Sequence, residues 1–425
     1  MKALAAACDD VHARGNGFAA APGSTQQAAD VMRVAAEHGL TAAARGGGSR
    51  LGWGTPSRPD LLIETTRMSG ILEHAAGDLV ARVQAGTRMG DVAAELAKAG
   101  QELALDVPAA ATVGGVVASG LAGPRRLRYG TPRDLLIGIT VVRADGTVAK
   151  SGGKVVKNVA GYDLGKLFAG SDGTLGLITE ATFRLHPLPA ARAYVTAEYT
   201  AVSVACDAVA AAANSPLVAS AVEVSLAGPD APVRVGVLLE GSAEGVESRA
   251  ARMAALLGAA SVAGGPPGWW PAPLAAGPDQ TLIRVSYWVS ALGQVLDAIS
   301  AAAGRTGVRP SVEGSAGAGV LYLRLGPDGN GAAAADSGGG AGEAAGSVAE
   351  AGFGAEAQFI AALRELVAGQ RGAVTVLTAT AMVRAELASY GGMTGPVPGL
   401  ALMQSVKDRF DPGHRLAPGR FPAAV

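Results

Sequence analysis

The sequence predicts an α+β protein of two domains. Residues 1–190 alternate short apolar strands and helices with many glycine-bearing turns. From residue 191 onward, the predicted elements follow the order strand, helix, strand, strand, helix twice in succession, which is typical of a duplicated ferredoxin-like unit. A length of 425 residues also favours two or three domains over one.

The first predicted domain begins with a helix over residues 24–39. Ser24 can act as its N-cap, Gln27 follows three residues later as in a capping box, and Gly39 can end it. The Asp145-Gly146 pair separates two apolar runs and predicts a hairpin. Apolar runs between turn residues predict a helix over 91–99 and strands over 41–44, 61–65, 79–85, 135–143, 147–150 and 175–185.

The second predicted domain spans residues 191–385 and carries the duplicated unit. Within it, residues 330–354 consist mostly of alanine, glycine and small polar residues, so they cannot bury enough apolar surface and predict a flexible insertion. Residues 386–425 are expected to pack back on the first domain. Strands are predicted over 194–199, 219–225, 233–240, 282–288, 308–313, 320–325 and 374–378, and helices over 202–213, 244–257, 292–303 and 358–368.

The composition excludes several classes of function. The net charge is −1 and 17% of residues are charged, so we expect no nucleic-acid partner. The two cysteines, Cys8 and Cys206, lie far apart, and without a C-x-x-C pair this chain alone is not expected to hold a zinc or iron–sulfur site. The five histidines form no i, i+4 pair, so we expect no metal site. Loop residues interrupt the longest uncharged stretch, residues 253–278, and we expect a cytoplasmic protein.

Three consecutive glycines, Gly46–Gly48, directly follow a predicted strand and lie between Arg45 and Arg50. Successive backbone N–H groups in such a turn can form a concave anion-binding site. Ser49 adds a hydroxyl donor. A tight turn alone would also use glycine for positive φ angles, but three glycines between two arginines favour a phosphate or pyrophosphate ligand.

Two further glycine-rich segments lie downstream. In the segment 107–124, Gly114-Gly115 opens a predicted short helix whose N-terminus can offer N–H groups to an anion; a buried, close-packed alanine and glycine helix is the alternative. In the segment 170–185, Gly173 and Gly176 free the backbone beside a predicted strand. Three such segments in one α+β domain indicate a long ligand with a central diphosphate, and FAD fits this description better than a mononucleotide.

Five motifs, in this order, resemble a known family: "RGGGSR", "PAAATVGGVVASGLAGP", "RYGTPRDLLIGITVVRADGTV", "GGKVVKNVAGYDLGKLFAGSDGTLGLITEATFRL" and the terminal "FDPGHRLAPGRF". They are similar to the PCMH-type FAD-binding domain of the vanillyl-alcohol-oxidase/PCMH flavoprotein superfamily. Within it, the chain most resembles the FAD-binding E subunits of bacterial glycolate oxidases. The resemblance is dense over residues 45–188, returns at 410–421 and is weak between. It implies a PCMH-type FAD-binding domain followed by a cap domain.

The resemblance also implies a cofactor site. The segment 45–51 would be the pyrophosphate loop, and 126–134 and 154–163 would lie near the flavin ring. Many members of the superfamily attach FAD covalently through a histidine, often in the pyrophosphate loop; this loop has none, so non-covalent FAD is expected. The implied cofactor-binding residues are Arg45, Gly46, Gly47, Gly48, Ser49, Arg50, Leu51, Pro108, Thr112, Val113, Gly114, Gly115, Ser119, Gly120, Asp172, Gly173, Thr174, Leu175, Gly176 and Ile178.

The chain departs from its catalytic relatives in the cap. Those relatives carry an H-x-G-D-G-N-x-H segment, whereas "GPDGNGAAAAD" at 326–336 has no histidine, and none lies between His186 and His414. A histidine base in the cap is therefore excluded, although oxidation of a hydroxy acid needs a group that accepts the hydroxyl proton. Weak candidates for that role or for holding the carboxylate are Arg128, Tyr129, Tyr162, Tyr322 and Arg384, each of which is also explained as a structural or surface residue.

The resemblance finally implies a complex that oxidises glycolate, a small 2-hydroxy acid, to glyoxylate. The partners would be a catalytic flavoprotein D subunit and an iron–sulfur F subunit, and any membrane contact would be peripheral, through the complex. A self-sufficient 2-hydroxy-acid dehydrogenase and a non-catalytic assembly subunit are the alternatives. The loop "GGPPGWWPAP" at 264–273 carries two tryptophans and is either a partner contact or folded onto the cap core.

Overall fold

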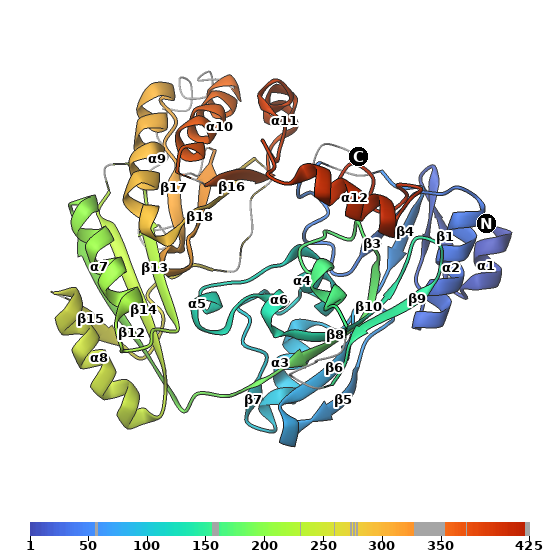
Figure 1. The fold of residues 1–425 in the computed structure, drawn as a ribbon, viewed down its shortest axis with the longest axis horizontal. Helices are drawn as coiled ribbons and strands as arrows, with labels where there is room; N and C mark the ends of the chain where they lie inside the picture. The colour runs from blue at the N-terminus through green and yellow to red at the C-terminus, as the bar shows by residue number, and fades with distance from the viewer. Residues whose placement is uncertain are drawn as a thin grey trace, which may run out of the picture. The chain divides into compact units, whose positions relative to one another are not determined.

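The computed structural model describes residues 1–425 apart from 56–57, 155–160, 230, 259, 273, 275–276, 278, 327–352, 371 and 421–425. Most of the predicted insertion, and part of the predicted flavin-side segment 154–163, thus lie outside the described residues. The chain divides into two compact units (Figure 1). The first comprises residues 1–123, 129–188 and 397–425, and the second comprises 124–128 and 189–396.

The first unit contains a four-stranded sheet in the order β1-β2-β4-β3, with bounds Val11–Arg14, Gly17–Ala20, Leu61–Glu64 and Ala42–Arg45. Helices α1 (Lys2–Ala7) and α2 (Thr25–Glu37) share a hydrophobic core with this sheet. The Ser24 hydroxyl accepts a hydrogen bond from the Gln27 N–H, as predicted for the N-cap. The Gln27 side chain, however, accepts from the N–H of Gly23 rather than completing a capping box.

A five-stranded antiparallel sheet forms the other half of this unit, in the order β5-β6-β10-β8-β9. Its strands are Ile71–Ala75, Val80–Gln84, Leu177–Arg184, Leu136–Val142 and Val148–Gly152. The predicted hairpin is confirmed, because β8 and β9 pair around a turn in which Gly146 has a φ of +81°. Smaller elements are α3 (Met89–Ala97), β7 (Gln101–Glu102), α4 (Val113–Ser119), α6 (Pro132–Leu135) and β11 (His186–Pro187).

Of the C-terminal segment predicted over residues 386–425, residues 397–425 belong to the first unit, whereas residues 386–396 belong to the second. Helix α12 (Leu400–Phe410) contributes Val406 and Phe410 to the core beside the five-stranded sheet. Beyond it, the chain forms a parallel bridge between Leu416 and Ala42 at the start of β3. The Ala42 N–H donates to the Arg415 carbonyl, and the Ala417 N–H donates to the Ala42 carbonyl, both at 2.8 Å. The end of the described chain is therefore attached directly to the strand that leads into the glycine run.

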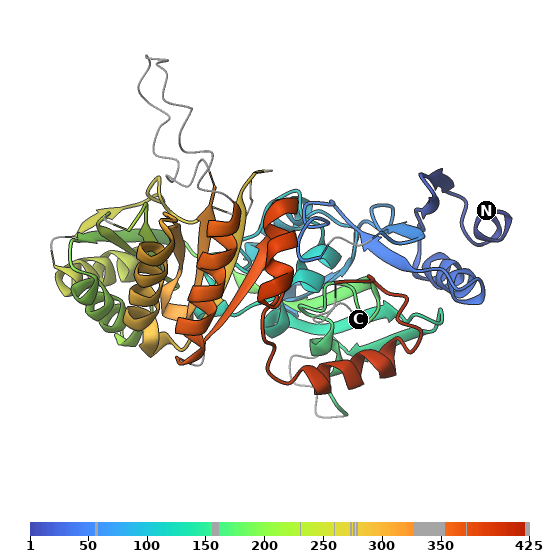
Figure 2. The same cartoon turned by 90° about the horizontal axis from the view of Figure 1, so that it is seen from above.

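The second unit contains an eight-stranded sheet in the order β15-β12-β14-β13-β17-β18-β16-β19, and helices α7 to α10 cover one face of it (Figure 2). Each half runs strand, helix, strand, strand, helix, strand, and the halves join where β13 pairs with β17. The predicted ferredoxin-like duplication is confirmed. The first half comprises β12 (Ala191–Tyr199), α7 (Val202–Asn214), β13 (Ala221–Leu226), β14 (Val233–Gly241), α8 (Ala243–Leu257) and β15 (Ser261–Ala263).

The second half comprises β16 (Thr281–Ser286), α9 (Leu292–Thr306), β17 (Ser311–Ser315), β18 (Val320–Leu325), α10 (Phe353–Ala368) and β19 (Ala373–Thr378). Helix α11 (Ala381–Leu387) follows, and α5 (Arg126–Tyr129) lies at the unit boundary. Along the strands other than β15, alternate side chains enter the core beneath the helices, among them Val222, Val237, Ile283 and Leu323. Residues of the opposite face, among them Leu238 and Leu282, are buried as well.

The tryptophan loop of the second unit folds onto its own sheet. The Trp270 ring packs edge-to-face on Tyr194 of β12, with ring centroids 5.0 Å apart. A Cβ atom on Gly236 of β14 would lie 2.7 Å from Trp269 and 2.8 Å from Trp270, so both rings cover this glycine. Both tryptophans are half-buried. Of the two predicted alternatives, these contacts favour the loop folded onto the cap domain over a partner contact.

Candidate functional site

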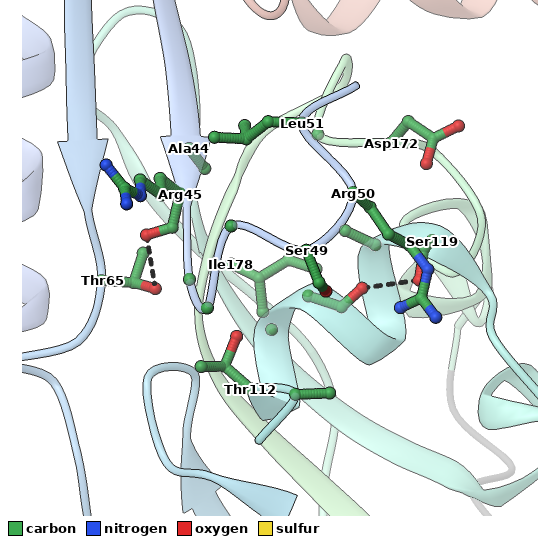
Figure 3. Close-up of a pocket in the computed structure, with 18 of the residues that line it drawn as sticks. Ala44, Arg45, Ser49, Arg50, Leu51, Thr65, Thr112, Ser119, Asp172 and Ile178 are labelled. Carbon is green, nitrogen blue, oxygen red and sulfur yellow. Dashed lines mark hydrogen bonds between the residues drawn. The ribbon is translucent and has the colours of Figure 1, made fainter. Parts of the chain in front are cut away.

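A pocket in the first unit lies where three backbone segments meet (Figure 3): the loop after β3, the start of α4 and the turn before β10. A single arginine from the C-terminal segment joins them. The lining residues are Ala44, Arg45, Gly46, Gly47, Gly48, Ser49, Arg50, Leu51, Thr65, Ala111, Thr112, Gly114, Gly115, Ala118, Ser119, Asp172, Gly173, Gly176, Ile178 and Arg420.

The loop after β3 presents four successive backbone donors. The N–H groups of residues 46–49 make no hydrogen bond to any other described residue. Gly46 and Gly48 are half-buried, whereas Gly47 and Ser49 are exposed. Buried backbone N–H groups are nearly always paired, so those of Gly46 and Gly48 favour an acceptor from a ligand. Adjacent N–H groups of this kind form a concave surface that binds anions.

The glycines of the loop are also required by contacts within the protein. A Cβ atom on Gly46 would lie 2.0 Å from the Thr112 hydroxyl oxygen, and one on Gly47 would lie 3.0 Å from the Ala110 carbonyl oxygen. Gly48 has a φ of +77°, which favours glycine. The absence of side chains here therefore lets the loop approach residues 110–112 as well as a ligand, a reason that the sequence did not reveal.

Thr112 supplies a second polar group without a partner. It is 3% exposed, and its hydroxyl makes no hydrogen bond to a described residue. Figure 3 shows Thr112 below the loop at the floor of the pocket. A buried hydroxyl without a partner is destabilising by about 1–3 kcal/mol. A ligand acceptor in the pocket would remove that penalty.

Helix α4 offers fewer free donors than its sequence suggested. The Val113 N–H donates to the Thr87 carbonyl at 2.9 Å, and the Gly114 N–H donates to the Ala85 carbonyl at 2.8 Å. The Gly115 N–H has no acceptor among the residues that the structure describes. The helix start therefore contributes Gly115 and the Thr112 side chain, while its first two N–H groups hold it to the neighbouring chain.

The turn before β10 has a strained backbone. Asp172 has a φ of +51°, Gly173 follows at +78°, and the Asp172 N–H donates to the Ala118 carbonyl of α4 at 2.7 Å. An aspartate in this conformation is uncommon but tolerated. At the far end of the turn, a Cβ atom on Gly176 would lie 2.9 Å from the Phe168 ring. These constraints hold the turn against α4 at the edge of the pocket.

All three arginines in the lining have partners within the protein. The Arg45 guanidinium lies 3.4 Å from the Glu64 carboxylate, and Figure 3 shows its side chain on the side of the strand away from Arg50. The Arg50 guanidinium lies over the Trp53 ring, 4.5 Å from its centroid. The third, Arg420, donates to the Arg50 carbonyl at 3.3 Å and also to the Leu51 carbonyl.

Burial lowers the pKa of Arg420 below its ordinary value, and the nearby Asp172 carboxylate opposes this shift. The pocket is therefore lined by backbone donors and positive charge, with one carboxylate, Asp172, at its exposed edge. Such a donor set suits an anionic ligand such as a phosphate or diphosphate.

Most of the predicted cofactor-binding residues lie together. Those outside the lining are Pro108, Val113, Gly120, Thr174 and Leu175. Val113, Thr174 and Leu175 are buried in the protein interior around the pocket. The sequence analysis missed Ala44, Thr65, Ala111, Ala118 and Arg420. Alanine side chains have no polar group that would indicate a binding site. Arg420, in contrast, follows a glycine within the terminal motif "FDPGHRLAPGRF", and this pair was a signal that could have identified it.

The weak catalytic candidates are not in this pocket. In the first unit, the Tyr129 ring packs on His186 with centroids 4.8 Å apart, and Tyr162 is 90% exposed. In the second unit, the Tyr322 hydroxyl accepts a hydrogen bond from Arg126 at 3.1 Å. Arg128 is exposed, and Arg384 lies on α11. Within either unit, these positions do not define a catalytic cluster.

Two further observations concern the part of the chain that the structure describes. No group of three or more His, Cys, Asp or Glu side chains there is arranged to hold a metal ion. None of its helices combines the length and apolar character needed to cross a membrane.

Comparisons with known proteins agree with a flavin site. Residues 18–152 match the family model described as an FAD binding domain. The solved structure of p-cresol methylhydroxylase matches this chain with a TM-score of 0.72 and 16% identity. The match covers 99% of this chain and 96% of the methylhydroxylase. The crystal structure of a glucooligosaccharide oxidase of Acremonium strictum, which revealed a novel flavinylation, has a TM-score of 0.66 and an identity of 16%. The match covers 100% of this chain and 98% of the oxidase. These likenesses show a shared fold.

Relatives matched by sequence cover a smaller part. The glycolate oxidase subunit GlcD of Bacillus subtilis is 35% identical over 196 residues, 44% of this chain and 41% of the relative. The glycolate oxidase subunit GlcE of Escherichia coli is 42% identical over 125 residues, 29% of this chain and 36% of the relative. A D-lactate dehydrogenase of Archaeoglobus fulgidus is 36% identical over 172 residues, which are 39% of this chain and 38% of the relative. The matches span less than half of each relative.

Proposed function

We propose that the PCMH-type FAD-binding domain of this chain holds FAD with its diphosphate on the glycine loop after β3. The observation that carries this proposal is the run of four backbone N–H groups, residues 46–49, without an acceptor among the described residues. A diphosphate supplies several acceptor oxygens at the spacing of adjacent N–H groups. The Thr112 hydroxyl would donate to the same group, which gives its buried oxygen a partner.

Non-covalent attachment of FAD is part of the proposal. The lining contains neither histidine nor cysteine, the residue types that form flavin bonds in some relatives of this fold. A cofactor held without a covalent bond depends on the hydrogen bonds of the loop for its affinity. The site residues named above would therefore set how tightly FAD is retained.

We assign the chain to flavin-dependent oxidation of 2-hydroxy acids, as the flavin-binding E-type subunit of a glycolate oxidase complex. FAD held in this site would supply an electron acceptor for that oxidation. Both GlcD-type and GlcE-type relatives match this chain. The E-type assignment draws on the second domain, where no histidine lies between His186 and His414 to act as a base.

The proposed partners follow from this assignment. A D-type flavoprotein subunit would oxidise glycolate to glyoxylate, and an iron–sulfur F-type subunit would receive the electrons. The chain has only two cysteines, Cys8 and Cys206, which are too few for a Cys₄ cluster. An iron–sulfur group would thus belong to another chain. Association with a membrane, if the complex has one, would come through these partners.

A spectroscopic experiment tests the proposal. The purified chain should show the visible absorption of oxidised flavin, and acid precipitation should release all of it as free FAD. Under anaerobic conditions, glycolate should leave the flavin oxidised until the D-type subunit is added. Flavin that stays with the acid-precipitated protein would contradict non-covalent binding.

The same experiment separates the alternative functions. Direct bleaching by glycolate or D-lactate in the isolated chain would replace the E-type assignment with a self-sufficient 2-hydroxy-acid dehydrogenase, an alternative that the D-lactate dehydrogenase relative favours. A folded chain that binds no FAD in titrations would indicate an assembly subunit and would contradict the site.

A further inference from the structure

Arg420 reaches the pocket from the far end of the chain. Its Nη2 group donates to the Arg50 and Leu51 carbonyls, 370 and 369 residues away in sequence. These two carbonyls close the loop whose preceding N–H groups, at residues 46–49, have no acceptor. Arg420 is also one of the residues that line the pocket. The residue therefore belongs to the lining, and its guanidinium is bonded to the loop.

The Asp172 carboxylate acts electrostatically on the Arg420 guanidinium, but no ion pair links the two side chains. Among the described residues, no carboxylate lies within ion-pair distance of its guanidinium, and the remaining N–H groups of the side chain have no acceptor. A partly buried guanidinium normally pairs with a carboxylate or a phosphate. Arg45 of the same lining already forms an ion pair with Glu64. Arg420 forms no such pair with a described residue and can bind an anion that enters the pocket.

We propose that Arg420 binds the anionic part of the pocket ligand, and that the C-terminal segment is thereby a component of the cofactor site. This inference rests on the proposed function, because it takes the ligand to be FAD and the anion its diphosphate. Two N–H groups of a guanidinium can contact two phosphate oxygens at once while Nη2 keeps its bonds to the loop carbonyls.

The attachment of the segment makes this role possible. The bridge between Ala42 and Leu416 fixes the chain four residues before Arg420. Further back, Lys407 donates to the Leu416 carbonyl at 3.1 Å and to the Thr174 carbonyl at 2.8 Å. The same buried ammonium group thus holds the C-terminal segment and the turn before β10. Binding of the anion and docking of this segment would stabilise each other.

The test measures the affinity of the purified apoprotein for FAD and for riboflavin, which lacks phosphate. R420Q should raise the Kd for FAD about tenfold or more, the usual size for loss of a charge-assisted hydrogen bond, and should leave the Kd for riboflavin unchanged. R420K should show a smaller loss, because it keeps the charge without the two-pronged geometry. R409Q is the matched control, since Arg409 is an exposed arginine on α12 outside the pocket lining; it should bind both flavins as the wild type does.

The outcomes separate this inference from the proposed function. Equal FAD affinity in the wild type and R420Q, or equal losses for FAD and riboflavin, would overturn the role of Arg420 while FAD binding stands. If R420Q does not fold, R420K decides the question, and unchanged FAD affinity in that variant overturns the inference. Inorganic pyrophosphate serves as a second probe: Arg420-dependent binding of pyrophosphate without FAD binding would keep the inference and remove the proposed function. Binding of neither ligand by the wild type would overturn both.

Discussion

The ammonium group of Lys407 donates a hydrogen bond to the main-chain carbonyl of Thr174, 2.8 Å away and 233 residues earlier in the sequence. Lys407 is 1% exposed, and its charge is balanced by the Asp411 carboxylate at 2.6 Å. Asp411, 0% exposed, also accepts from the Leu416 N–H at 2.8 Å. This buried pair connects α12, the segment that carries Arg420 and the turn before β10.

Replacement of Lys407 by methionine should destabilise the protein strongly. The substitution keeps the volume but leaves the Asp411 carboxylate buried without its partner, which is expected to lower the free energy of unfolding by about 3–5 kcal/mol. Urea-induced unfolding measures this change. R409Q on the same helix is the control and should change it by less than about 0.5 kcal/mol. The double variant K407M/D411L should be more stable than K407M alone; a further loss would show that the pair is not the cause.

Substitution of Gly46 by alanine should disturb the pocket through a steric clash. The added Cβ atom would lie 2.0 Å from the Thr112 hydroxyl oxygen, so the loop must move away from α4. We expect a loss of about 2 kcal/mol in unfolding free energy, a typical value for overpacking, and a large loss of FAD affinity. Gly52, whose Cβ would meet no atom within 4 Å, provides the control G52A. In G46A/T112A the stability should partly return, and no recovery would point to another cause.

Thr112 should affect ligand binding more than folding. T112V keeps the shape and removes a hydroxyl that has no partner among the described residues. The free energy of unfolding of the apoprotein should therefore stay the same or rise, while the Kd for FAD should rise about five- to tenfold for loss of one hydrogen bond. T112S should keep most of the affinity. Titration of flavin fluorescence measures both variants, and unchanged affinity in T112V would exclude the hydroxyl from the site.

The fold was predictable where one face of an element is buried. The order of the predicted strands and helices from residue 191 onward identified the duplicated domain, and the PCMH-type fold followed from the motifs. Two elements gave no such signal. Strand β1 has one half-buried residue followed by three exposed ones, so it lacks the alternation of a half-buried strand. The fully buried residue of helix α12 is a lysine, Lys407. Because this position is not apolar, a search for apolar periodicity does not identify the inner face of the helix.

The site was predictable from glycine-rich segments but not from their contacts. The three segments do meet at one pocket, because β3, α4 and β10 belong to the same unit. The sequence did not show that the Gly114 N–H donates a hydrogen bond to the Ala85 carbonyl. It also did not show that a side chain at Gly46 would clash with Thr112. Arg420 was missed because its position depends on the bridge between Ala42 and Leu416. Such tertiary contacts have no local sequence signature.

Acid should weaken the link between Thr41 and Asp60, at the starts of β3 and β4. The Thr41 hydroxyl and N–H both donate to the Asp60 carboxylate, at 2.6 and 2.9 Å, and these bonds hold the pKa of Asp60 below its ordinary value of 3.8. A lowered carboxyl pKa stabilises the folded state above the ordinary pKa, and this stabilisation is lost as the pH falls through the folded-state pKa.

The variant D60N tests this dependence. The wild type should exceed D60N in unfolding free energy by about 1 kcal/mol at pH 7, a modest value because the carboxylate is exposed, and the difference should shrink as the pH falls below 3.8, the ordinary pKa of the group. Urea unfolding at several pH values gives both curves. E37Q, which removes an exposed carboxylate from the end of α2, should leave the pH dependence unchanged. Parallel curves for the wild type and D60N would contradict the assignment.

Substitution of Gly236 by alanine should displace the two tryptophans of the second unit without affecting flavin binding. A Cβ atom at this position would lie 2.7 Å from Trp269 and 2.8 Å from Trp270, so both rings must shift. The intrinsic tryptophan fluorescence should move to longer wavelength as the rings become more exposed to water, and the unfolding free energy should fall by about 1–3 kcal/mol. The Kd for FAD should stay the same, because the pocket lies in the other unit.

G228A is the control, since a Cβ atom on Gly228 would meet nothing within 4 Å. An unchanged emission spectrum in G236A would show that the rings do not cover Gly236 in solution and would reopen the tryptophan loop as a partner surface.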